Sequence, residues 1–164
     1  MHFDGVSELP QAALATNVPL GYRCTWVHLK HVNTGKCVFT QAIGKGYVLS
    51  IPVAHAEGRF IFAKEKEDSY LQRLYDNDQL VFRYCTEDGE YANREYPVNP
   101  NGSVDSIAGL TDSTGRVLGL MPHPERHVRK TQHPHWSRLY KTQDARHKTQ
   151  DTMYGDGMTI FNNA

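Results

Sequence analysis

"YRCTWVHLKHV", residues 22–32, decides the fold class of this chain. Polar and apolar side chains alternate along it, and aromatic and β-branched residues are frequent, so it predicts a β-strand. A turn follows at "NTG". Further strands are predicted over residues 36–43, 47–53, 60–63 and 79–86, and two short strands within 105–124 are joined by a turn at 112–115. The chain is therefore expected to be rich in β-structure.

Few helices are expected beside these strands. One short helix is predicted within residues 5–19, opened by Ser7 and ended before Pro19. A second follows residue 63, with Leu71, Leu74 and Tyr75 on one face. The last residues, "GMTIFNNA", predict only the first turns of a helix. Strand 47–53 is mostly apolar and is expected to be buried on both faces, which requires helical cover that this chain scarcely supplies.

The composition indicates one domain and excludes several classes of partner. The chain has 164 residues, with 18 basic and 18 acidic side chains, so it carries no global charge that would attract nucleic acid or an anionic membrane. No apolar run is long enough for a transmembrane helix, and the first residues lack the pattern of a signal peptide. An odd number of cysteines, Cys24, Cys37 and Cys85, indicates a reducing compartment and a cytoplasmic protein. Each cysteine lies in a strand-like context and is expected to be a small buried side chain.

"MPHPER" contains a candidate catalytic pair, His123 and Glu125. Imidazole is the usual general base near neutral pH, and a carboxylate on its second ring nitrogen fixes the tautomer. Pro122 and Pro124 restrict the backbone on either side of the histidine. The apolar lead-in places His123 at the carboxyl end of a strand, where ligands bind in open α/β sheets. Spacing alone does not separate a catalytic pair from a charged surface turn.

Two other polar segments are candidate sites. "HAEGR" places His55, Glu57 and Arg59 after an apolar strand, although spacing alone favours a solvated strand end there. "NPNGS" holds Asn99 and Asn101, a residue type that tolerates positive φ, with a proline between them that stiffens the turn, and it is as consistent with a structural loop as with a binding loop.

Four histidines near the catalytic pair raise the alternative of a metal site: His123, His127, His133 and His135. Zinc sites usually add cysteine or carboxylate ligands, and the proline inside "HPERH" prevents a helical ligand pair. We therefore predict no metal site. The short basic and aromatic run "RKTQHPHW" is expected to be a solvated loop or a protein interface rather than a nucleic-acid site.

Several motifs occur together and in order: "RCTWVHL", "LSIPVAHAEGRF", "LVFRYC", "YPVNPNGSVDSIAGLTDSTGRVLGLMPHPER" and "DGMTIFNNA". In this combination the chain resembles the PurQ family, the glutaminase subunits of phosphoribosylformylglycinamidine synthase among the class I glutamine amidotransferases. The resemblance runs from about Gly5 to the C-terminus. It implies an α/β fold, the C-terminal part of a flavodoxin-like open sheet. Residues 1–164 are expected to form one amidotransferase domain that is truncated at its N-terminus relative to the family.

The resemblance also implies an activity, a partner and the roles of residues. Such an enzyme hydrolyses L-glutamine and passes ammonia to a synthetase subunit, which forms an amidine during purine biosynthesis. His123 and Glu125 correspond to the catalytic histidine and glutamate. A place near the active site or the synthetase contact is implied for His55, Glu57, Arg59, Asn99 and Asn101. ATP and magnesium belong to the synthetase, so no cofactor is expected in this chain.

One departure from the family concerns the nucleophile. Class I glutaminases carry a cysteine in a strand-to-helix elbow of the form G-x-C-x-G-x-Q, and no such motif occurs in this sequence. Cys24 matches the family's "F-x-C-R-W-V" strand instead. The chain is therefore expected to be inactive alone, because a His–Glu pair needs a nucleophile to activate. The alternative is a non-catalytic interaction module that docks on a synthetase.

Overall fold

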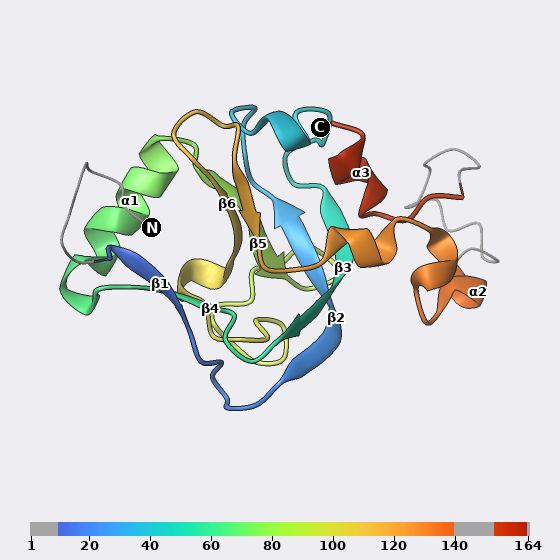
Figure 1. Ribbon diagram of the computed structural model, residues 1–164, viewed down its shortest axis with the longest axis horizontal. Coiled ribbons are helices and arrows are strands. Elements are labelled where there is room, and N and C mark those ends of the chain that lie inside the picture. Colours follow the sequence, from blue (N-terminus) through green and yellow to red (C-terminus); the bar gives the residue numbers. More distant parts are fainter. Residues whose placement is uncertain (1–9, 140–152, 164) are drawn as a thin grey trace.

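The computed structural model describes residues 10–139 and 153–163. Its largest element is a five-stranded sheet in the order β3-β2-β5-β6-β7, in which every neighbouring pair is antiparallel (Figure 1). The strands are β2 (Arg23–His31), β3 (Val48–His55), β5 (Leu80–Cys85), β6 (Ile107–Thr111) and β7 (Leu118–Leu120). The strand predicted from "YRCTWVHLKHV" is confirmed, as are the predicted strands around 47–53, 79–86 and 105–124. An antiparallel sheet can leave part of a face in water, which explains why so few helices suffice.

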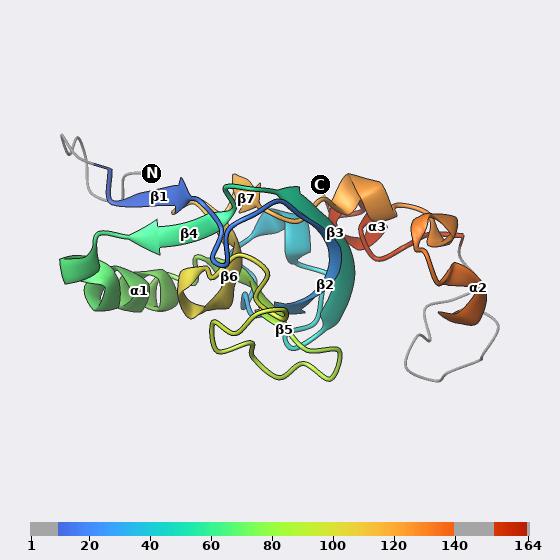
Figure 2. The same ribbon diagram turned by 90° about the horizontal axis from the view of Figure 1, so that it is seen from below.

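Strand β3 lies at one edge of this sheet, and the position of Pro52 explains why. Proline has no N–H to donate to a neighbouring strand, so it is tolerated mainly on edge strands. The outward edge of β3 is nevertheless paired, because the carbonyl of Pro52 accepts a hydrogen bond from the backbone N–H of His123 (2.8 Å). Since His123 follows β7, which lies at the opposite edge in the strand order, the sheet curls until its two ends approach each other (Figure 2).

A second, smaller layer consists of a two-stranded ribbon and one helix. Strands β1 (Ala12–Ala15) and β4 (Arg59–Phe62) pair antiparallel, and α1 (Glu67–Asp76) follows after the short 3-10 helix η2 (Lys64–Lys66). Tyr70 and Leu74 are one helical turn apart on the buried face of α1, where they pack with Phe60 and Phe62. The predicted strand 60–63 and the predicted helix after it are confirmed.

The remaining elements are short. The 3-10 helices are η1 (Val38–Thr40), η3 (Val104–Ser106), η4 (Pro124–His127) and η5 (Lys130–Gln132); the α-helices are α2 (Trp136–Leu139) and α3 (Met158–Phe161). Helix α3 confirms the predicted C-terminal helical turns. Both views place α1 and the β1–β4 ribbon at one end of the molecule and α2 and α3 at the other (Figures 1 and 2).

The helix predicted within residues 5–19 is wrong where the structure describes it. Residues 12–15, "AALA", form β1 and pair with β4 from Ala12↔Phe62 to Ala15↔Arg59. Alanine favours helices, but a segment confined between Pro10 and Pro19 is too short for a stable isolated helix. Pairing with β4 supplies the backbone hydrogen bonds instead. Ser7, the predicted start, lies outside the described residues.

The strand predicted over residues 36–43 is also wrong. Its only regular element is η1, and the Asn33 side chain organises the segment before it. The buried carboxamide oxygen of Asn33 accepts hydrogen bonds from the backbone N–H groups of Gly35 (3.1 Å) and Cys37 (2.9 Å). Such local side-chain bonds compete with strand pairing.

Within the described residues, no helix has the length and apolar character that a membrane span requires.

Candidate functional site

The pair predicted from "MPHPER" is assembled in the structure. His123 precedes η4, and its Nδ1 lies 2.7 Å from Oε1 of Glu125. The His123 side chain is 32% exposed and that of Glu125 55% exposed, so both are accessible to a substrate. Because Nδ1 faces the carboxylate, Nε2 is the ring nitrogen available to a reacting group. This is the orientation that a general acid–base histidine needs.

The turn that carries the pair is fastened to the sheet through its backbone. His123 N–H donates to the carbonyl of Pro52, and Arg126 N–H donates to the carbonyl of His123 (3.1 Å). Pro124 occupies the first position of η4, where a missing N–H costs nothing. The Nε atom of Arg126 lies 3.7 Å from Glu125 Oε1, an exposed contact that contributes little to stability.

The two other predicted segments, "HAEGR" and "NPNGS", are brought together in a buried polar network. Asn101 donates from Nδ2 to the carbonyl of Gly58 (2.8 Å). Ser103 Oγ donates to Asn101 Oδ1 (2.7 Å), and Asn99 Nδ2 donates to the carbonyl of Ser103 (2.9 Å). Asn99, Asn101 and Ser103 are all 0% exposed. These side chains therefore hold the two loops against each other.

Residue Asn17, which the sequence did not indicate, completes this network. Its Nδ2 donates to the carbonyls of His55 and Gly21 (both 2.9 Å), and its Oδ1 accepts from Gly58 N–H (3.0 Å) and meets His55 Nδ1 (3.1 Å). Asn17 is 0% exposed, and its bonds to His55 and Gly58 are buried away from water. No local pattern around Asn17 reveals this role, because its partners His55 and Gly58 lie about forty residues away in the chain.

The site residues predicted in "HAEGR" and "NPNGS" thus differ in how exposed their side chains are. His55, Asn99 and Asn101 are buried, whereas Glu57 is exposed and Arg59 is half-buried. The Nε atom of Arg59 is buried and has no hydrogen-bond partner among the described residues. Burial is the main cause that lowers the pKa of His55, and the nearby His123 lowers it further. Glu57 and Arg59 are therefore the members of this set with accessible side chains.

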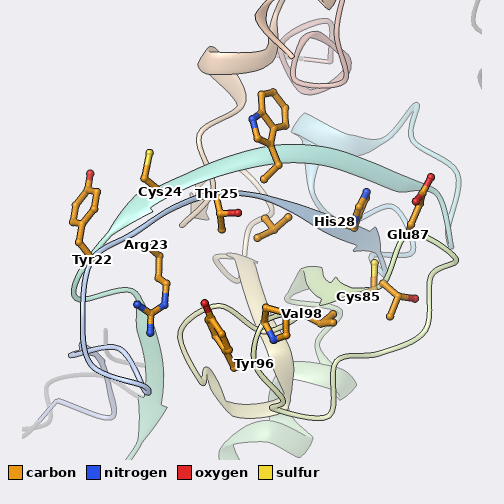
Figure 3. A pocket seen from close by; sticks show the side chains of 13 residues that line it. Tyr22, Arg23, Cys24, Thr25, His28, Cys85, Glu87, Tyr96 and Val98 are labelled. Atoms are coloured by element: carbon orange, nitrogen blue, oxygen red, sulfur yellow. The ribbon is translucent and has the colours of Figure 1, made fainter. Parts of the chain in front are cut away.

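The three cysteines differ from the expectation that all are buried. Cys37 and Cys85 are buried, and burial raises the pKa of the Cys85 thiol to about 11. Cys24 is exposed, because the first residues of β2 project beyond the core. Figure 3 shows Cys24 pointing to the opposite side of the strand from Arg23, which faces Tyr96. The expectation was therefore wrong for Cys24.

A hollow of about 560 Å³ separates β2 from residues 96–98 (Figure 3). The guanidinium of Arg23 lies 5.0 Å from the centre of the Tyr96 ring and donates from Nε to the carbonyl of Pro100 (3.1 Å). Neither His123 nor Glu125 lines this hollow. This hollow and the candidate catalytic pair are therefore separate features.

Two of the histidines considered for a metal site, His127 and His133, pack against Trp26 of β2, with ring centroids 4.9 and 4.2 Å away. Ring contacts join His127 to His133 (5.7 Å between centroids) and His133 to His135 (5.9 Å). Within the described part of the chain, no three His, Cys, Asp or Glu side chains are grouped as metal ligands. The Nδ1 atom of His127 is instead 2.7 Å from the carbonyl of Ser50.

Four histidines should make the fold sensitive to acid. Burial is the main cause that lowers the pKa of His28, His31, His55 and His133 below the ordinary 6.5. Near and below pH 6.5 the unfolded chain therefore binds more protons than the folded chain, so stability is full above this pH and is lost as the pH falls. We expect the urea midpoint to be lower at pH 5.5 than at pH 7.5. Equal midpoints would contradict this assignment, and H31N should reduce the difference.

Comparisons with known proteins show the family to which this chain is similar. Residues 2–164 match the family described as CobB/CobQ-like glutamine amidotransferase domain. Two similar relatives are phosphoribosylformylglycinamidine synthase subunits PurQ. The subunit from Archaeoglobus fulgidus is 50% identical over 121 residues, which cover 74% of this chain and 43% of the relative. The subunit from Methanococcus maripaludis strain C5 is 40% identical over 153 residues, which cover 93% and 54%.

A solved structure of a related complex has a similar fold. A chain in the structure of PurLQS from Thermotoga maritima superposes with a TM-score of 0.61 at 28% identity, covering 95% of this chain and 52% of that chain. The chain thus spans about half the length of the curated relatives that it matches. The predicted family and the predicted fold class are confirmed. Because the family match extends over nearly the whole sequence, the chain belongs to the CobB/CobQ-like glutamine amidotransferase family.

Proposed function

We propose that this chain provides the histidine–glutamate part of the glutaminase site of a phosphoribosylformylglycinamidine synthase. The observation that carries the proposal is the 2.7 Å contact between His123 Nδ1 and Glu125 Oε1, on a turn hydrogen-bonded to β3. The similarity to PurQ subunits and to a chain of PurLQS supports it. The proposed substrate is L-glutamine, and the proposed product passed to the synthetase is ammonia.

In this mechanism Nε2 of His123 takes the proton of a cysteine thiol, and the resulting thiolate attacks the glutamine amide carbon to form a tetrahedral intermediate. Nε2–H of His123 gives its proton to the departing nitrogen, and ammonia and a thioester result. His123 then removes a proton from water, which attacks the thioester and releases glutamate. Glu125 keeps the imidazole in one tautomer and stabilises the imidazolium.

The cysteine nucleophile of this scheme is proposed to come from a segment other than the described strands. Cys37 and Cys85 are buried, and Cys24 lies within strand β2 rather than on a strand-to-helix turn. Next to the turn that carries His123 and Glu125, called the catalytic turn below, β7 is the last strand of the described sheet. It borders an apolar hollow of about 430 Å³, whose lining includes Leu120 and Met121. A strand edge can pair with an additional strand, and the apolar hollow beside it can be covered by another segment.

Contacts with a synthetase are proposed for Glu57 and for Arg59 at the start of β4, because these side chains are accessible while His55, Gly58 and Phe60 are buried. ATP and magnesium would act at the synthetase, and we expect the complex in the cytoplasm.

A single-chain chimera tests the function. The elbow-bearing part of the Archaeoglobus fulgidus PurQ subunit is joined to this chain, and ammonia release from L-glutamine is measured with and without a synthetase. We expect no release from the 164-residue chain alone, release from the chimera, and none after the elbow cysteine is changed to serine. Ammonia release from the chain alone that is lost in C24S would place the nucleophile within it. A folded chimera that binds the synthetase but does not hydrolyse glutamine would favour the non-catalytic interaction module.

A further inference from the structure

The outward edge of β3 beside the catalytic turn is capped by two side chains from the C-terminal part of the chain. The carbonyl of Ser50 accepts a hydrogen bond from Nδ1 of His127 (2.7 Å). The N–H of Ser50 donates to Oδ2 of Asp156 (2.7 Å). With the bond between His123 and Pro52, three successive outward groups of this strand edge are paired. The capping fixes where the turn sits along β3.

The catalytic turn is also covered from outside by residues 155–157. Gly157 N–H donates to the carbonyl of His127 (2.9 Å). A Cβ atom on Gly157 would lie 2.0 Å from the carbonyl oxygen of Pro124, and one on Gly155 would lie 2.4 Å from the His127 ring. Only glycine allows so close an approach of two backbones. The motif "YGDGM" therefore packs directly on "PERH".

His127 is held rigidly in this arrangement. It is 1% exposed, and its ring meets Trp26 edge to face at 4.9 Å between centroids. Because a carbonyl oxygen can only accept, the hydrogen in the bond to Ser50 resides on Nδ1 of His127. Because His127 belongs to η4, a buried ring with one fixed hydrogen bond also restrains the position of the η4 backbone.

We propose that His127 and Asp156 are positioning residues for the reaction: together they fix the η4 turn on β3 and so hold His123 against Glu125. This inference rests on the proposed function for its catalytic meaning. Neither side chain is proposed to touch the substrate. A small displacement of a catalytic group is costly, because reactivity depends steeply on distance and angle.

Nitrogen NMR of the histidine rings in the 164-residue chain tests the geometry without any catalysis. In the unmodified chain, we expect neutral His123 to give the signature of one tautomer, with the hydrogen on Nδ1. In His127→Ala and in Asp156→Ala, we expect loss of that signature and an average of two tautomers. The matched control is Met153→Ala, a change in an exposed side chain of the same segment, which should leave the His123 signals unchanged.

Two milder variants separate positioning from general loss of structure. Asparagine places its amide nitrogen near the position of histidine Nδ1, whereas glutamine does not. H127N should therefore retain the His123 signature, and H127Q should lose it while the signals of β2 and β5 persist. Unchanged His123 signals in H127Q would overturn the proposal, even if His127→Ala fails to fold.

The active chimera provides an independent readout. There H127Q should lower kcat by about 10- to 100-fold with KM changed by less than about 2-fold. An inactive parent chimera with the NMR differences intact would refute the proposed function and leave the positioning effect established. Unchanged kcat in H127Q would refute the positioning role.

Discussion

Replacing His123 by alanine in the active chimera should reduce kcat for glutamine hydrolysis by about 10²- to 10⁴-fold, the usual contribution of a general acid–base residue. Among the residues that the structure describes, the His123 ring is the acid–base group that lies within hydrogen-bond distance of Glu125 Oε1. Without it, the departing amide nitrogen has no positioned proton and the thioester has no base to activate water. KM should change little, because the ring acts mainly in the transition state.

Steady-state ammonia release measures this prediction, and thioester trapping identifies the step. His135→Ala, which removes an exposed histidine outside the pair, should leave kcat unchanged. Glu125→Gln should also lower kcat, because the carboxylate orients the ring and stabilises its protonated form. If His123→Ala retained near-normal kcat, the assignment of the general base would be wrong.

Asn17→Ala should cause the largest loss of stability among single changes at the site. It leaves the Gly58 N–H, the His55 carbonyl and His55 Nδ1 without their partner in a region that excludes water. An unpaired buried polar group costs roughly 1–3 kcal/mol, so we expect a loss of about 3–5 kcal/mol in the free energy of unfolding.

Urea unfolding of the 164-residue chain measures this loss. The matched control is Asn162→Ala, because the Asn162 side chain is exposed and its removal should change stability by less than about 0.5 kcal/mol. A loss of under about 1 kcal/mol for Asn17→Ala would show that water replaces the missing amide. It would also mean that the loops at 55–58 and 99–103 do not depend on this residue.

Strong local patterns were sufficient to predict most of the sheet. The alternation in β2 and the apolar run of β3 reflect burial on the sheet, which any strand at these positions must satisfy. Predictions from local patterns were wrong where hydrogen bonds to other segments determined the backbone conformation. "AALA" became a strand because it pairs with β4, and residues 36–43 did not form one because Asn33 binds the N–H groups of Gly35 and Cys37 around the start of this segment.

The sequence by itself determined the family, the strand that precedes the site and the identity of the His123–Glu125 pair. These properties reside in contiguous motifs, and proline restricts the backbone wherever it occurs. Only the tertiary structure decided which polar residues serve as scaffold. Asn17, Asn101 and His55 meet across long stretches of chain, and so do His127, Asp156 and Ser50. A buried hydrogen bond is specified by where two segments cross, and that crossing is a property of the folded chain rather than of either segment.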